Sequence, residues 1–162
     1  LDAEVLSSGA RDRAGLGEVL ARRGAALLLD PRPGQHGPDA AARAMALRPG
    51  IRLVLGSHVH LEAAGPDGET ASLVVRHGRV RIVIALARPG EFPPADALIA
   101  PAAVLAGDPA GMPGALFIAT GRPLSDQLAP AGALCTCHSG TIELRSDGRA
   151  LRVHRPTLPA AG

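Results

Sequence analysis

The sequence has very few aromatic residues and contains no lysine. Its 162 residues include two phenylalanines, Phe92 and Phe117, and neither tryptophan nor tyrosine. Single-stranded nucleic acids bind by stacking on aromatic rings, so this class of ligand is excluded. Schiff-base chemistry and phosphate-loop chemistry both need a lysine and are excluded as well. The 17 basic residues are all arginines, scattered along the chain and opposed by 15 acidic residues. Because nucleic-acid phosphates bind to a clustered basic face, we expect no nucleic-acid partner.

Long apolar runs are also missing. The longest are short segments such as Ile82–Ala87, so no transmembrane helix is expected. No signal peptide is visible, although the chain opens at Leu1 and not at a methionine. The compartment is not fixed by these features, and the cytoplasm is the favoured location. With 46% hydrophobic and 20% charged residues in a length typical of one domain, the chain is expected to bury a core.

The first 50 residues have the pattern of a small α/β part. Apolar residues at helical spacing predict a helix over Arg11–Arg23, and Ala25–Leu29 is typical of a short buried strand. Alanine, methionine and leucine favour a second helix over Asp39–Leu47.

After Gly50 the pattern becomes that of strands and turns. Strands are expected over the ranges 51–55, 72–75, 79–87, 115–119, 141–145 and 150–153, with hairpin turns at His77-Gly78 and at Ser146-Asp147-Gly148. The proline-rich segment Pro89–Pro113 is expected to form loops and short extended pieces. The predicted fold class is therefore α+β, with a small α/β part over residues 1–50 and a β-rich module over residues 51–162.

The two cysteines, Cys135 and Cys137, are separated by one residue. A disulfide between such close positions is strained and uncommon, so we expect two reduced thiols. His138 follows directly, and Cys135 with His138 forms a C-x-x-H spacing. A thiolate and an imidazole at this spacing on a tight loop suit one metal ion. Cys135 and His138 are therefore the first candidate ligands.

The segment around these ligands resembles the second half of a Rieske iron–sulfur domain. The resemblance covers residues 114–159 and includes Gly121-Arg-Pro-Leu-Ser-Asp126 upstream of the cysteines. The other matching positions are Cys135, His138, Ile142, Glu143, Leu144, Gly148, Pro156 and Pro159. The resemblance implies a [2Fe–2S] cluster, electron transfer and an oxidoreductase partner protein. A form without a cluster would serve as a binding or docking subunit.

The chain departs from the Rieske pattern at the first ligand loop. The cysteine and histidine of that loop fall on Phe117 and Ala119, which bind no iron. His58 and His60, together with Cys137, are the candidate substitutes, because two imidazoles and two thiolates suit either such a cluster or a tetrahedral zinc ion. On a strand, His58 and His60 would lie on one face. Zinc, or no metal at all, is thus the alternative to the cluster.

A second interpretation starts from the same two histidines. The segment Ile51–His60 resembles the end of a calcineurin-like metallophosphoesterase, in which an H-x-H pair follows an apolar strand and binds metal. This resemblance implies a metal-dependent hydrolase that uses His58 and His60. Such sites need further ligands, for which Asp30 and His36 are the nearby candidates, and the chain has no asparagine.

A third interpretation makes the chain a cysteine enzyme. Leu134-Cys-Thr-Cys137 resembles the L-x-T-C motif of sortases, with His58 and Arg149 as the partners of a Cys137 nucleophile. The other histidines, including His77 in its predicted turn, are expected to be solvated.

Overall fold

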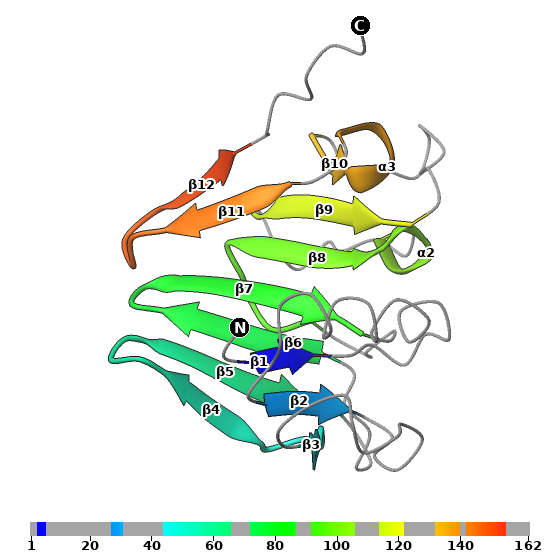
Figure 1. The fold of residues 1–162 in the computed structure, drawn as a ribbon. Helices are drawn as coiled ribbons and strands as arrows, with labels where there is room; N and C mark the ends of the chain where they lie inside the picture. The colour runs from blue at the N-terminus through cyan, green and yellow to red at the C-terminus, as the bar shows by residue number, and fades with distance from the viewer. Residues whose placement is uncertain are drawn as a thin grey trace, which may run out of the picture.

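A computed structural model of the chain describes residues 3–5, 27–30, 44–65, 72–86, 92–105, 114–121, 132–139 and 142–154. Within these ranges the secondary structure is mostly β, and its strands form one large and two small sheets (Figure 1). The β-rich character expected for the chain is confirmed.

One half of the large sheet is antiparallel. It consists of β4 (Arg52–Leu55), β5 (Val59–Ala64), β6 (Ser72–His77) and β7 (Val80–Ala85), each paired with the next. His77 pairs with Val80, so two residues, Gly78 and Arg79, make the β6–β7 turn. Gly78 has a φ of 59°, which is the left-handed conformation that such two-residue turns require. The expected strands at 51–55, 72–75 and 79–87 and the hairpin at Gly78 are confirmed, whereas β5 was not among the strands expected.

The other half of the large sheet is parallel. β8 (Ala97–Pro101), β9 (Leu116–Thr120) and β10 (Leu134–Cys135) extend the sheet beyond β7 in the order β7-β8-β9-β10. Parallel neighbours need long crossover connections, and the short helix α2 (Ala102–Leu105) lies in the one between β8 and β9. β8 is thus one of the short extended pieces expected from Pro89 to Pro113, whereas helix α2 was not expected there. Prolines flank β8, but its apolar residues are buried in the core.

The first small sheet consists of parallel strands from the N-terminal part. Its order is β1 (Ala3–Val5), β2 (Leu27–Asp30) and β3 (Ala44–Ala46). The helix expected over Asp39–Leu47 is contradicted by β3. Helix propensity is a weak preference that tertiary packing overrides, and here Met45 and Leu47 pack into a buried cluster. The helix predicted over Arg11–Arg23 lies outside the described residues.

That buried cluster joins the small parallel sheet to the large sheet. Leu29 from β2 and Leu47 pack with Leu61, Ala63 and Leu73 from β5 and β6. A second cluster fills the other side of the large sheet, around Val74, Val83, Leu98 and Leu105. The α+β class with a small α/β part is therefore wrong, because the described N-terminal residues form strands and pack on a mixed, mostly β structure. The boundary near residue 50 stays a prediction.

The last sheet is a single hairpin docked on a turn of the large sheet. β11 (Glu143–Ser146) and β12 (Leu151–His154) pair in antiparallel fashion. The N–H of Arg79 donates a hydrogen bond of 2.7 Å to the carbonyl oxygen of Gly148. The β6–β7 and β11–β12 turns are thus in direct contact. No described helix is long and apolar enough to cross a membrane.

Candidate functional site

Three hairpin turns surround one pocket at the same end of the molecule. These turns join β4 to β5, β6 to β7 and β11 to β12, and all three lie at the left in Figure 1. The pocket has a volume of about 620 Å³. We call it the turn pocket; its lining residues are Ser57, His58, His60, Arg76, His77, Gly78, Asp147, Gly148 and Arg149.

His60 and Arg76 stand side by side on the large sheet. They are direct cross-strand partners in the β5–β6 register, so their side chains share one face. Both are exposed, whereas Val74, two residues before Arg76 on that face, is buried. His58 lies in the turn before β5 and is also exposed, so only His60 of the pair lies on a strand. The turn nevertheless brings both imidazoles to the same pocket.

His77 links the pocket to the last hairpin. Its Nδ1 and the hydroxyl of Ser146 are 3.2 Å apart and share a hydrogen bond. The same hydroxyl accepts a hydrogen bond of 3.1 Å from the N–H of Gly148. His77 is half-buried, and the expectation of a solvated residue was wrong. The reason is the docking of the β11–β12 hairpin, which local sequence does not reveal.

Asp147 is held in place by its own turn. One oxygen, Oδ1, accepts hydrogen bonds of 2.8 Å from the N–H groups of both Arg149 and Ala150. These bonds favour the ionised carboxylate, and they hold the pKa of Asp147 below its ordinary value, with the bond from Ala150 as the largest cause. Asp147 therefore carries its negative charge into the pocket at neutral pH.

The two arginines of the pocket give it excess positive charge. Elsewhere arginines are paired: a guanidinium nitrogen of Arg52 lies 3.4 Å from a carboxylate oxygen of Glu62, and one of Arg145 lies 2.9 Å from Glu143. The hydrogen bond from Arg145 lowers the pKa of Glu143. In contrast, the guanidinium groups of Arg76 and Arg149 form no salt bridge within the described residues. Among the described residues that line the pocket, two cationic groups thus face one carboxylate, that of Asp147, which favours an anionic ligand.

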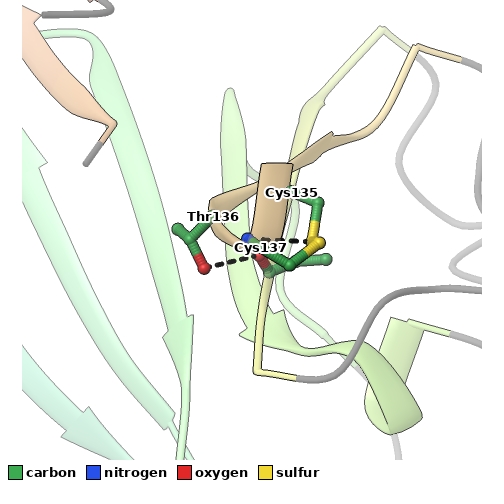
Figure 2. The surroundings of a disulfide bond; sticks show 4 residues. Cys135, Thr136 and Cys137 are labelled. Atoms are coloured by element: carbon green, nitrogen blue, oxygen red, sulfur yellow. Dashed lines mark hydrogen bonds between the residues drawn. A yellow bond between two sulfur atoms is a disulfide. The ribbon is translucent and has the colours of Figure 1, made fainter. Parts of the chain in front are cut away.

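The cysteines lie at the opposite edge of the large sheet. Cys135 ends β10 and Cys137 lies in the short helix α3 (Thr136–Ser139), and a disulfide joins the two (Figure 2). The expectation of two reduced thiols was wrong, because both cysteines of the chain are paired. The structure describes the backbone of His138 in α3 and not its side chain, so a role for His138 stays a prediction.

Neither sulfur shares a site with the histidine pair. Five strand spacings separate β10 from β5, and at about 4.8 Å per spacing this amounts to about 24 Å. A joint site of Cys135, Cys137, His58 and His60 is therefore not assembled. Asp30 ends β2, but its side chain is outside the described part of the structure, and His36 lies outside the described residues altogether. No group of three or more His, Cys, Asp or Glu side chains in the described part of the chain is placed to hold a metal ion.

These findings correct the iron–sulfur interpretation. An iron–sulfur cluster is held by cysteine thiolates, and here each cysteine is bonded to the other. The description of the chain as a Rieske-like, electron-transferring module of an oxidoreductase is therefore wrong. The same pairing leaves Cys137 without the thiolate that a sortase-like nucleophile needs.

Comparison with known proteins assigns no family. No family model and no curated protein matches the chain, so its likeness to the Rieske family stays a resemblance in sequence. Among solved structures, the chain is similar to the crystal structure of the metallo-beta-lactamase fold protein YhfI from Bacillus subtilis. The identity is 14% and the TM-score is 0.48, over 74% of this chain and 64% of that chain. This similarity is too low to assign a fold family or a function.

Sequence reasoning identified only part of the turn pocket. It singled out His58 and His60, which do share a pocket, but it missed Arg76, His77 and Asp147. Each of these three lies next to a glycine turn that the sequence predicted correctly. The missing information was which turns pack together, and nothing in the spacing of the residues indicates that.

Proposed function

We propose that the chain is a metal-dependent hydrolase of phosphate esters and that the turn pocket is its active site. The observation that carries this proposal is the gathering of His58, His60 and His77 around one cavity of about 620 Å³. Imidazole nitrogen is a preferred ligand of zinc, and cavities of this size hold small-molecule substrates.

The described residues fit part of a zinc site. His58 and His60 offer two imidazole nitrogens, whereas a catalytic zinc has three protein ligands. No third ligand within the described ranges joins them. When bound, the metal would supply a Lewis acid and an activated water molecule.

The charges of the pocket support a phosphate ester as substrate. The guanidinium of arginine offers a planar pair of donors that matches two phosphate oxygens. Arg76 and Arg149 place such groups at the pocket wall, without a salt bridge to any described residue. His77 is oriented by its hydrogen bond with Ser146 through Nδ1, which leaves Nε2 to transfer a proton to the leaving group.

The test is hydrolysis of bis(p-nitrophenyl) phosphate by the full chain, first freed of metal and then supplied with Zn²⁺ or Mn²⁺. We expect activity only with metal. His58→Ala and His60→Ala should each lower kcat/KM by roughly 10- to 100-fold and weaken Zn²⁺ binding in calorimetry. His154→Ala is the matched control, since His154 is exposed at the end of β12 and does not line the pocket.

Two results would overturn the proposal. One is the absence of hydrolysis with either metal by a chain whose circular dichroism shows it to be folded. The other is a His58→Ala, His60→Ala double variant that binds Zn²⁺ and turns over substrate as the parent chain does.

A further inference from the structure

The Cys135–Cys137 disulfide does little to hold the fold together. It closes a loop with one residue, Thr136, between the cysteines, and a disulfide stabilises a fold chiefly by closing long loops. Strand β10 is already fixed on β9, where Cys135 pairs with Ala119. The hydroxyl of Thr136 also donates a hydrogen bond of 3.4 Å to the carbonyl oxygen of Ala119 (Figure 2). The bond thus joins positions that other contacts already fix.

The two sulfurs occupy different environments. Cys137 is exposed, whereas Cys135 is half-buried against the cluster around Val83 and Leu98. The N–H of Cys137 lies 3.2 Å from Sγ of Cys135 and donates a hydrogen bond to it (Figure 2). A hydrogen bond to sulfur stabilises the thiolate, so Cys135 is the better leaving group of the pair.

From this asymmetry we propose that Cys135–Cys137 is a thiol–disulfide exchange site that reacts with a dithiol. A thiolate of the dithiol attacks Sγ of the exposed Cys137, and a mixed disulfide forms there. The bond between the two cysteines breaks, and its electron pair leaves on Sγ of Cys135, which accepts the N–H of Cys137. The second thiolate of the dithiol then attacks its own sulfur in the mixed disulfide and releases Cys137. The dithiol becomes a disulfide, and both cysteines take up its two protons.

This reaction is a two-electron exchange between sulfur atoms and involves no metal. The site lies about 24 Å from the turn pocket by the strand spacing given above. Its test therefore does not depend on whether the chain hydrolyses phosphate esters.

The experiment measures how fast each cysteine exchanges. Full-length Cys135→Ser and Cys137→Ser variants are treated with oxidised glutathione, and the adducts are followed by mass spectrometry. We expect Cys137, the remaining cysteine of the Cys135→Ser variant, to form its adduct roughly tenfold faster than Cys135 does in the other variant. Circular dichroism of each variant checks that the fold is retained.

A second measurement uses the parent chain. Native protein is incubated with dithiothreitol, and the thiols are counted after alkylation. We expect two thiols to appear without unfolding, and the disulfide to re-form in oxidised glutathione. Equal exchange rates of the two single cysteines, or a disulfide that dithiothreitol reduces only in urea, would overturn the proposal.

Discussion

At the scale of single residues, Gly78 combines a left-handed backbone conformation with a close approach to the backbone of Gly148. Its φ is 59°, and a Cβ added there would collide with the carbonyl group of Gly148. We predict that Gly78→Ala destabilises the chain by about 2–4 kcal/mol, in which the left-handed conformation accounts for about 1–2 kcal/mol and displacement of the last hairpin for the rest. Urea denaturation followed by circular dichroism measures this change.

Gly50→Ala is the matched control for that substitution. Gly50 also has a positive φ, 84°, but apart from its chain neighbours no atom of the described residues lies within 4 Å of an added Cβ. Gly50→Ala should therefore lower the free energy of unfolding only by the cost of the left-handed conformation, about 1–2 kcal/mol. Equal losses for the two variants would mean that the contact with Gly148 is unimportant.

Residue-level chemistry was only partly readable from the sequence. The H-x-H spacing of His58 and His60 pointed to a shared site, and a tight turn places both at one pocket. His77 gave no such indication, because its partner Ser146 lies 69 residues away in the chain. The disulfide was missed for a different reason, since the general rule on close cysteines argued against it.

At the scale of elements, the β11–β12 hairpin owes part of its stability to one ionised side chain. The folded pKa of Asp147 lies below its ordinary value because Ala150 and Arg149 donate N–H groups to it. A lowered folded pKa stabilises the folded form above the unfolded value of about 3.9, and this contribution is lost as the pH falls through the folded pKa. We predict that the backbone amides of Arg149 and Ala150 exchange hydrogen with solvent faster below the folded pKa of Asp147 than at a pH of about 6. The comparison is made after correction for the intrinsic exchange rates at each pH.

Asp147→Asn separates this effect from other acids in the hairpin. The asparagine keeps an oxygen acceptor but does not titrate. Glu143, whose pKa is also lowered, titrates in both chains. In the variant, amide hydrogen exchange at Arg149 and Ala150, measured by NMR, should therefore depend much less on acid pH than in the parent chain. If the variant retains the full dependence, Asp147 is not its source.

Element prediction succeeded where the signals were local. The two hairpins with glycine in their turns, β6–β7 and β11–β12, were predicted from such local signals. The strands β4, β8 and β9 differ in how clearly the sequence indicates them. β4 and β9 follow apolar runs and were predicted as strands, whereas β8, among prolines, was predicted only as one of several short extended pieces. β3 was predicted as helix because alanine and methionine prefer helices in the absence of tertiary contacts.

At the scale of the whole molecule, the small parallel sheet packs against the large sheet through Leu29. Its side chain is fully buried, at 0% exposure, in the cluster that it shares with Leu61 and Leu73. We predict that Leu29→Ala costs about 2–5 kcal/mol of unfolding free energy, because it leaves a cavity between the sheets. Thermal unfolding by calorimetry checks this value.

Val54→Ala is the control for that loss. Val54 lies on the edge strand β4 and is 61% exposed. Its truncation should cost less than about 1 kcal/mol. A Leu29→Ala variant as stable as Val54→Ala would show that the two sheets are not joined through this cluster.

The overall topology could not be derived from the sequence. Strand order across the large sheet depends on long crossovers between β7, β8, β9 and β10, and no local pattern states which strands become neighbours. The sequence thus predicted a β-rich module over residues 51–162 but not its mixed sheet, and it located two histidines but not the pocket that they line.

The docking of the β11–β12 hairpin on the β6–β7 turn has a consequence for protein synthesis. When a nascent chain has left the ribosome as far as Ser139, every strand of the large sheet is outside, yet one wall of the turn pocket is still inside the ribosome. The turn pocket is therefore completed last, after the large sheet has formed.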